Sequence, residues 1–195
     1  SFGMNPVGTG PNTPKMIAAL SKLKWLLVVE NVESETAQFW KAPKEYGGAD
    51  PSKIATEVYL LPAALFAEKD GSFTNSARWA QWKWKALDPP GKAKPDAEIL
   101  ARIVLALKDL YRKEGGKFPD PILRTTWNYG KEVDIHRVAK EINGYYLEDV
   151  YDKKANPPKL LGKKGELCAT FVHLQADGTT SCGNWLFSQS YTQKE

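Results

Sequence analysis

The stretch NPVGTGPNTPKMIAALSKLKWLLVVEN, residues 5–31, places a Pro/Gly-rich loop, a helix and an apolar run in succession. Thr13 is expected to cap the helix, with Pro14 at its first position, where the missing N–H costs nothing. The run at 24–29 is continuous and stops at Glu30, which is typical of a strand buried on both faces of a parallel sheet.

Two further strands are expected around this unit. The opening residues SFGM read as the end of a buried strand, and residues 58–61 form another buried strand closed by Pro62. Between them, Ser34 is expected to cap a short helix. Strands that alternate with helical segments predict an α/β fold with right-handed crossovers and a parallel sheet.

The second half of the chain changes character. Asp96 is expected to cap the clearest helix, which Gly115 and Gly116 end, and a weaker helix is expected over 134–143. From Pro157 onward, Gly-punctuated apolar runs, including residues 168–174, predict a tail rich in β-hairpins.

Composition narrows the possible classes of protein. The 195 residues are 42% hydrophobic and 26% charged, which is ordinary for a globular domain. A net charge of +4 argues against nucleic-acid or membrane partners, and no apolar run is as long as a membrane span. The first residues lack a signal-peptide pattern, and because the chain starts within an apparent strand, we expect it to be a piece of something longer.

The residues with metal-binding or nucleophilic chemistry are few. Cys168 and Cys182 lack the partners of a zinc or iron–sulfur site, and they are either a disulfide or two thiols. His136 and His173 have no nearby nucleophile and no second His at metal spacing. The sequence therefore predicts no catalytic centre and no metal site in this chain.

One group of residues suggests a nucleotide. In an open parallel sheet, ligands lie beyond the carboxyl ends of the strands, and the loop that carries Gly8 and Gly10 precedes a helix at this edge. Glu30 follows at about 20 residues, where an acid grips a ribose in dinucleotide folds. Because residue 13 is Thr, the motif GxGxxG is incomplete, and nucleotide binding and a purely structural loop stay equally open.

A second polar group lies in residues 61–82, which carry Glu68, Gly71, Asn75, Ser76 and Arg78. Amide, hydroxyl and guanidinium groups can pair with ring edges or a phosphate. The alternative is an ordinary polar loop with a hydrogen-bonded turn.

The three tryptophans Trp79, Trp82 and Trp84 alternate with basic residues. They could form a platform for single-stranded nucleic acid, or they could pack within the protein with lysines at the rim. Packing is favoured because the chain lacks a broad basic field.

Five blocks of sequence resemble one family. They are FGMNPVGTGPN (2–12), VVENVESETAQFW (28–40), EVYLLPAALFAEKDGSFTNSARWAQWKWK (57–85), TTWNYG (125–130) and DGTTSCGNWLF (177–187). In this order they are similar to the second half of the large, catalytic subunit of formate dehydrogenase, of the respiratory or periplasmic type, in the molybdopterin oxidoreductase superfamily. The resemblance covers residues 2 to about 190.

The resemblance implies a cofactor, a reaction and partners. Family members hold molybdenum or tungsten between two molybdopterin guanine dinucleotides, oxidise formate to carbon dioxide, and pass electrons through a [4Fe–4S] cluster to an iron–sulfur subunit. It implies a Rossmann-like domain over 1–150, incomplete at its N-terminus, and a β-rich tail over 151–195 that leads to a further domain. It also implies a periplasmic location.

The same resemblance assigns cofactor-binding residues by their match to the family's blocks. Glu30 stands where relatives usually have Asp, an acid expected to hold guanine or its ribose. The matching positions are Asn5, Pro6, Gly10, Pro11, Asn12, Glu30, Ser34, Thr36, Glu68, Gly71, Asn75 and Arg78. The metal-ligating and cluster-binding cysteines of the family have no counterpart here, so the chain alone is expected to be inactive and to bind no cofactor.

Two alternatives stay open, together with a physical expectation. The parent could be another molybdopterin oxidoreductase, such as a nitrate reductase relative, or the chain could be a stand-alone nucleotide-binding module. As a piece cut from a larger protein, the chain is expected to expose apolar surface and to self-associate, for example by edge pairing.

Overall fold

The computed structural model describes residues 1–74, 80–152 and 154–181. Its contacts divide the chain into two units, one formed by 1–69 and 86–124 and the other by 70–85 and 125–195. The first unit contains α1 (Pro6–Thr9), α2 (Thr13–Leu20), β1 (Trp25–Glu30), β2 (Glu57–Pro62), α3 (Asp96–Glu114) and α4 (Asp120–Arg124). The second unit contains β3 (Gly71–Thr74), β4 (Ala80–Lys83), α5 (Ile135–Asn143), β5 (Val150–Asp152) and β6 (Lys159–Gly162).

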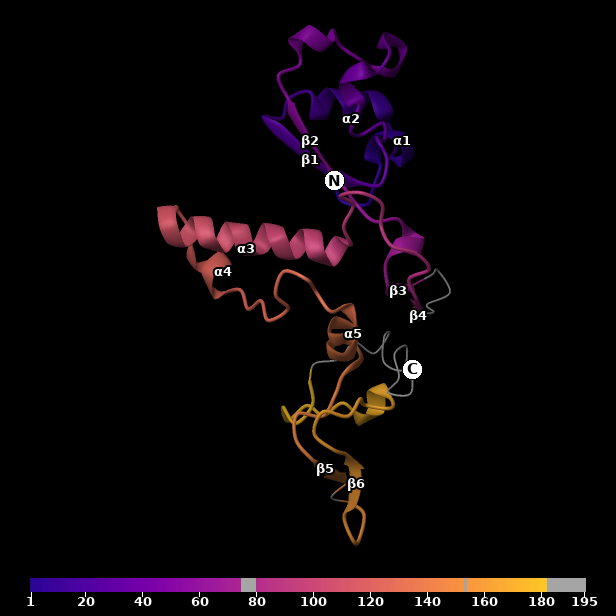
Figure 1. The fold of residues 1–195 in the computed structure, drawn as a ribbon, viewed down its shortest axis with the longest axis vertical. Coiled ribbons are helices and arrows are strands. Elements are labelled where there is room, and N and C mark those ends of the chain that lie inside the picture. The colour runs from indigo at the N-terminus through magenta and orange to yellow at the C-terminus, as the bar shows by residue number, and fades with distance from the viewer. Residues whose placement is uncertain (75–79, 153, 182–195) are drawn as a thin grey trace. The chain divides into compact units, whose positions relative to one another are not determined.

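The first unit is built around two parallel strands, β1 and β2, which run side by side in Figure 1. Trp25 pairs with Glu57 at one end and Glu30 with Pro62 at the other. On the opposite edge of β1, Phe2 forms a parallel bridge with Val29. The predicted parallel pairing of β1 and β2 is confirmed, as is the mixed helix and strand class, whereas the opening residues form a single bridge rather than the predicted buried strand.

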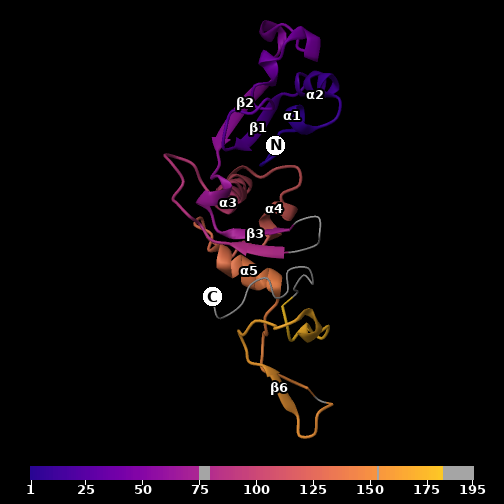
Figure 2. The same ribbon diagram turned by 90° about the vertical axis from the view of Figure 1, so that its right-hand side faces the viewer.

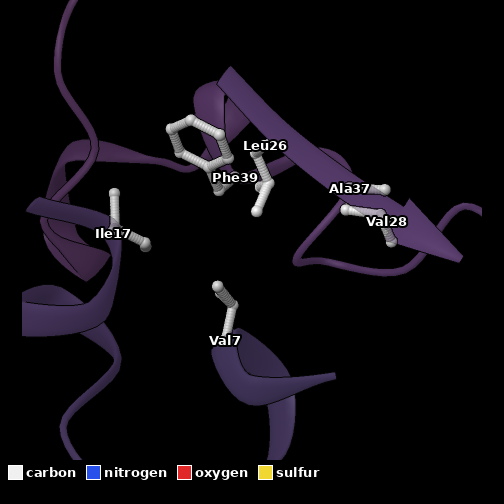
Figure 3. Close-up of a cluster of buried hydrophobic side chains, with 6 residues drawn as sticks. All are labelled: Val7, Ile17, Leu26, Val28, Ala37 and Phe39. Atoms are coloured by element: carbon white, nitrogen blue, oxygen red, sulfur yellow. The ribbon is translucent and has the colours of Figure 1, made fainter. Parts of the chain in front are cut away.

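The core of this unit lies between β1 and the two short helices that precede it. Figure 3 shows Val7 of α1 and Ile17 of α2 on the side of β1 that carries Leu26 and Val28. Phe39 lies in the same cluster and is 1% exposed. The connection from β1 to β2 thus contributes the aromatic side chain of Phe39 to the core. Its helical structure consists of short 3-10 helices, Phe39–Lys41, Lys44–Tyr46 and Pro51–Lys53.

The second strand is not buried as predicted. The sequence pattern of residues 58–61 indicates burial on both faces, but five of the six β2 residues are exposed. Tyr59 and Leu61 share a face with Trp25, and all three are among the exposed large apolar side chains. The hydrophobic run specifies the strand correctly, whereas burial depends on what packs against it, and nothing within the described residues covers these three side chains fully.

Three predicted helix caps, Thr13, Ser34 and Asp96, are wrong. The N-cap of α2 is Asn12 rather than Thr13, since the Asn12 side chain accepts a hydrogen bond from Lys15 N. Asn12 has φ 61°, a left-handed conformation that Asn tolerates better than most residues. Ser34 does not cap a helix either, because the first helical turn after it begins only at Phe39.

The helix α3 confirms the longest predicted helix. Asp96 is its first residue rather than its cap, and Gly115, with φ 70°, ends it. Ile99 is buried against Val29 and Ala63 at the end of β1. Farther along, Leu107 and Leu110 are exposed, so the predicted apolar face is only partly buried.

In the second unit, β3 and β4 pair antiparallel, in a segment where a polar loop is the simplest sequence interpretation. The two strands lie next to each other in Figure 2. Trp82 and Trp84 pack near His136, with ring centroids 5.2 and 5.1 Å from it, and His136 Nε2 lies 3.5 Å from Asp70 Oδ2. This contact between hairpin and α5 supports the packing role predicted for the tryptophans; Trp79 lies outside the described residues.

The tail contains a hairpin, but only one of its strands was predicted: β6 matches the predicted run at 159–161, whereas β5 precedes the predicted region. β5 and β6 pair antiparallel, and Tyr146, Val150 and Cys168 form a small core beside them. Residues 168–174, predicted as a strand, instead contain the 3-10 helix Phe171–His173. Cys168 is a buried free cysteine, and the run that begins at Cys182 lies outside the described residues. Among the described residues, no helix is long and apolar enough to cross a membrane.

Candidate functional site

A cavity of about 690 Å³ opens in the first unit, beside the carboxyl end of β1. Its apolar lining comes from α1, α2 and the β1–β2 connection and includes Val7, Ile17, Val32, Phe39, Pro43 and Tyr46. Its polar lining comes from two loops and consists chiefly of Asn5, Glu33, Ser34, Glu35, Gln38 and Lys41. The size and the mixture of apolar walls with a few polar groups are typical of a ligand site.

Asn5 joins the two loops that line this cavity. Its side-chain oxygen accepts hydrogen bonds from Thr36 N at 3.2 Å, Thr36 Oγ1 at 2.8 Å and Gly8 N at 3.3 Å. Its amide nitrogen donates to Glu35 Oε2 at 2.5 Å. Because three donors surround the oxygen, the orientation of the amide is fixed, and the nitrogen must face Glu35.

Thr36 completes the connection from the other side. It is 0% exposed, and its hydroxyl accepts a hydrogen bond from Val7 N at 3.1 Å while donating to Asn5. Each side-chain polar atom of Asn5 and of the buried Thr36 therefore has a partner, as buried polar groups require. The residues form a rigid clasp, here called the Asn5–Thr36 clasp, between α1 and the loop after β1.

Ser34 differs from Thr36 in its hydrogen bonding. Ser34 is 7% exposed and lines the cavity, yet its Oγ is buried and has no hydrogen-bond partner among the described residues. A buried hydroxyl without a partner costs about 1–3 kcal/mol. Such a group at a cavity wall fits a site where a ligand supplies the missing hydrogen bond.

The charges at the cavity are mainly negative. Gln38 donates to the carboxylate of Glu33, and Lys41 Nζ donates to Gln38 Oε1 at 3.3 Å. A hydrogen bond from its own backbone, followed by that from Asn5, holds the pKa of Glu35 below its ordinary value. Two carboxylates against one ammonium group favour neutral N–H and O–H donors over anions.

The predicted residues of the first loop occupy structural positions around this cavity. Pro6 begins α1, and Gly10 ends it by donating its N–H to Pro6 O at 3.0 Å. Pro11 is exposed, and Asn12 caps α2. Of the five residues predicted in this loop, Asn5 alone lines the cavity.

The other predicted residues are dispersed. The carboxylate of Glu30 accepts from Asn31 N at 3.1 Å, and Glu30 does not line the cavity. Glu68 is 9% exposed and accepts from Leu65 N at 2.7 Å, which closes a turn. Gly71 begins β3 in the second unit. Asn75 and Arg78 lie outside the described residues.

Two acids line the cavity, Glu33 and Glu35, and both are absent from the predicted set of cofactor-binding residues, as are Gln38 and Tyr46. The segment VESETAQF (32–39) carries a signal for this wall of the cavity, because acidic residues alternate with small hydroxyl residues. Ser34 and Thr36 are buried, and Glu35 is exposed between them. The described residues contain no group of three or more His, Cys, Asp or Glu side chains that could hold a metal ion.

Comparison with known proteins identifies relatives. Residues 58–105 match the family model for molybdopterin oxidoreductases. The nitrate-inducible formate dehydrogenase major subunit of Escherichia coli is 45% identical over 98% of the chain and 19% of its own length. Formate dehydrogenase 2 subunit alpha (cytochrome c-553) of Nitratidesulfovibrio vulgaris is 42% identical over 100% of the chain and 18% of its own length.

A third relative, formate dehydrogenase subunit alpha of Megalodesulfovibrio gigas, is 38% identical over 100% of the chain and 19% of its own length. The chain therefore spans about a fifth of the length of the curated relatives that it matches. The resemblance predicted from the five sequence blocks is confirmed: part of the chain matches the model of the molybdopterin oxidoreductase family, and nearly the whole chain is similar to the large subunits of formate dehydrogenases.

Proposed function

We propose that this chain is a segment of the large subunit of a formate dehydrogenase, and that its first unit holds one end of a molybdopterin guanine dinucleotide. The observation that carries the proposal is the cavity beside β1, with the unpartnered Ser34 hydroxyl in its wall. The relatives named above are all formate dehydrogenase subunits, which favours formate over nitrate as the substrate of the parent protein.

Three features of the cavity fit part of a dinucleotide. Its volume and apolar walls suit a ring system, and its carboxylates suit the O–H and N–H donors of a nucleoside. Gly8 leaves room at the rim, since a Cβ there would lie 2.5 Å from Asn5 Nδ2 and 3.0 Å from Glu35 Oε2. The residues in place to hold the group are Asn5, Gly8, Ser34 and Glu35.

The contribution of this segment would be binding and orientation. When bound, a molybdopterin cofactor supplies the metal centre that takes up the two electrons of formate. The parallel strands would form part of a Rossmann-like domain, with the ligand beyond their carboxyl ends. A [4Fe–4S] cluster, an iron–sulfur partner subunit and a periplasmic location are further proposals, and they rest on the subfamily resemblance.

Ser34 offers a direct test in the complete large subunit, purified with its cofactor. Ser34→Ala removes an unpartnered buried hydroxyl, so the stability of the protein without cofactor should be unchanged or slightly higher. If the hydroxyl binds the cofactor, the amount of guanosine monophosphate that acid hydrolysis releases per subunit should fall. Ser52→Ala, at an exposed position, is the control. It removes a turn contact with Asp50 and should leave both the stability and the amount of released guanosine monophosphate unchanged.

Unchanged guanosine monophosphate in the Ser34→Ala protein, combined with unchanged retention after dilution, would argue against this cavity as the site. Wild-type protein that releases no guanosine monophosphate would argue against a guanine dinucleotide altogether. The two results are distinguishable because the second is read from the wild type alone.

A further inference from the structure

We propose that a cavity beside α5, in the second unit, binds a phosphate group, and that Arg137 and Lys140 are the residues that hold it. The residues that line this cavity are different from those that line the cavity beside β1. The inference therefore goes beyond the proposed function and does not depend on it. The phosphate group belongs either to free inorganic phosphate or to a phosphate monoester.

The cavity has a volume of about 350 Å³, and every side chain in its lining carries a polar group. It combines two cations, Arg137 and Lys140, with one carboxylate, Glu141. Uncharged polar groups come from a threonine and an asparagine in the loop before α5 and from two tyrosines. Because all of these side chains can form hydrogen bonds, the cavity suits a polar ligand rather than an apolar one.

One face of α5, the helix labelled in Figure 1, brings the charged groups to the cavity. Positions 137, 140 and 141 are three and four residues apart, the spacing that places side chains on one face of a helix. The neighbouring apolar side chains Val138 and Ile142 are partly buried. The pattern of the helix thus determines where the two cations lie.

The guanidinium group of Arg137 is held in place by two contacts. Its Nη1 donates to the backbone oxygen of Asn128 at 2.7 Å, and its Cζ lies 5.6 Å from the centre of the Tyr129 ring. A guanidinium has five N–H donors in a planar fork, and the contact with Asn128 uses one of them. The others are available to a ligand, and this fork matches the oxygens of a phosphate.

Lys140 brings a second cation to the same cavity. Its Nζ lies 5.4 Å from the centre of the Tyr145 ring, an attractive cation–π contact that favours this position of the ammonium group. Among the residues that the structure describes, Lys140 makes no ion pair and no side-chain hydrogen bond. An ammonium group has three donors, so those of Lys140 can be used by a ligand.

The carboxylate of Glu141 does not neutralise either cation directly. It accepts a hydrogen bond from Tyr129 Oη, and within the described part of the chain it forms no ion pair with Arg137 or Lys140. The hydrogen bond to Glu141, followed by burial, raises the pKa of Tyr129 above its ordinary value. The phenol and the carboxylate thus satisfy each other, and the two cations remain for a ligand.

The number of donors favours a phosphate over a carboxylate. Arg137 and Lys140 keep several N–H donors, and Thr126 and Asn128 add a hydroxyl and an amide to the lining. A carboxylate offers two oxygens in one plane, whereas a phosphate monoester offers three around a tetrahedral centre. At neutral pH it carries about two negative charges, which the two cations can neutralise.

A structural role is the alternative for Lys140. It lies in the last turn of α5, where a cation stabilises the C-terminal end of the helix dipole. This role explains the charge of Lys140, but it explains neither the fixed guanidinium of Arg137 nor the polar cavity that both residues line. The two roles also differ in what removal of the charge changes, which is stability alone in the first case and phosphate binding in the second.

The experiment is isothermal titration of inorganic phosphate, phenyl phosphate and acetate into the complete large subunit, purified with its cofactor in phosphate-free buffer. Phosphate and phenyl phosphate should each bind saturably at this site. Acetate should bind at least about tenfold more weakly, because it brings one charge and two oxygens. Tighter binding of phenyl phosphate than of phosphate would indicate an ester as the ligand, and equal binding would indicate the free ion.

Variants of Lys140 assign the binding to this cavity. Lys140→Gln should weaken phosphate binding by about tenfold, the effect expected for the loss of one charged hydrogen bond. Lys140→Arg keeps a cation over Tyr145 and should retain the wild-type affinity. The matched control is Lys131→Gln, which removes the same charge from an exposed position in the loop before α5 and should leave the affinity unchanged.

A variant of Glu141 should have the opposite effect. In Glu141→Gln the amide oxygen can still accept from Tyr129 Oη, while the negative charge near the two cations is lost. Phosphate should therefore bind more tightly, by about threefold, a typical effect of one exposed charge. A purely structural role of these residues would not produce tighter binding.

Four results would overturn the inference. They are the absence of saturable binding of phosphate and phenyl phosphate to the wild type, acetate that binds as tightly as phosphate, equal losses in Lys140→Gln and Lys131→Gln, and a lower denaturant midpoint of Lys140→Gln with unchanged phosphate affinity. The last result would assign Lys140 to the helix alone. Each of them leaves the proposed function unaffected, because that function is tested by the release of guanosine monophosphate and its dependence on Ser34.

Discussion

Thr36 Oγ1 donates a hydrogen bond of 2.8 Å to Asn5 Oδ1, although the two residues lie 31 positions apart in the sequence. The same hydroxyl accepts from Val7 N, so one buried side chain holds both α1 and Asn5. This relationship brings the first loop and the loop after β1 together, and the wall of the cavity depends on it.

Replacing Thr36 with Val should therefore destabilise the first unit. The change preserves shape but leaves Val7 N and one position on Asn5 Oδ1 without their partner, which costs about 1–3 kcal/mol. Urea unfolding followed by tryptophan fluorescence measures the loss. Thr36→Ser is the matched control, since it keeps the hydroxyl and loses one methyl group, and it should cost about 1 kcal/mol or less. Equal losses in the two variants would show that packing, rather than the clasp, matters.

Gly162 is a site where any side chain should be harmful. A Cβ at this position would lie 2.0 Å from Cε2 of Tyr146, whose ring is 1% exposed and cannot easily move. Gly162→Ala should destabilise the second unit by about 1–3 kcal/mol, the range typical of overpacking. Thermal unfolding by circular dichroism provides the measurement.

A second substitution tests the cause of that effect. In a Tyr146→Leu background the ring is gone, so adding Gly162→Ala should cost much less than it does in the wild type. A double-mutant cycle with no coupling between the two positions would contradict the steric explanation.

Stability should also fall at alkaline pH because of Tyr146. Burial, with smaller effects of Cys168 and Glu166, raises the pKa of Tyr146 to about 12 from its ordinary 10.0. A group whose pKa is raised in the folded state stabilises the fold fully below its unfolded pKa and loses this contribution as pH rises through the folded pKa. The free energy of unfolding should therefore decline between pH 10 and about pH 12.

Tyr146→Phe isolates this titration. The variant loses the hydrogen bond from Tyr146 Oη to Leu161 O, at 3.3 Å, so it should be slightly less stable at neutral pH. Its stability should change less between pH 10 and 12 than that of the wild type, with denaturant midpoints measured at each pH. Parallel pH profiles for the two proteins would rule out Tyr146 as the cause.

The isolated chain should self-associate through the sheet face that carries Trp25, Tyr59 and Leu61. These side chains are 61%, 47% and 36% exposed, and together they form an apolar stripe on parallel strands, which proteins usually cover on both faces. Sedimentation velocity should show a concentration-dependent rise in mass. Leu61→Lys should reduce it, while Leu110→Lys on α3 serves as a control at an exposed apolar site elsewhere.

A compact monomer at every concentration would contradict this expectation. A larger effect of Leu110→Lys than of Leu61→Lys would instead assign the association to the exposed face of α3.

Local patterns predicted what depends on local chemistry. The apolar run that becomes β1, the helical periodicity of α3 with its Gly115 stop, and the helix α5 expected over 134–143 all follow from neighbouring residues. Burial of β2 could not be predicted in the same way, because its apolar residues specify a strand without specifying what covers it.

The candidate site was less predictable for a related reason. Asn5, Ser34 and Glu35 all lie in blocks that match the family, but the contact of Glu35 with Asn5 at the cavity is visible only in the structure. That contact spans 30 positions and depends on the path of the whole β1–β2 connection. Glu30 has the expected place in the sequence, whereas its contact with Asn31 N is visible only in the structure.

The pairing of the first residues with β1 has a kinetic consequence. The amino group of Ser1 reaches Leu27 O across 26 positions, and Thr56 Oγ1 reaches Leu20 O across 36. Each closure orders a long loop before its contacts are gained, and such non-local pairing slows folding. The helices α2 and α3, whose hydrogen bonds join residues close in sequence, should form first. The parallel strands should pair last.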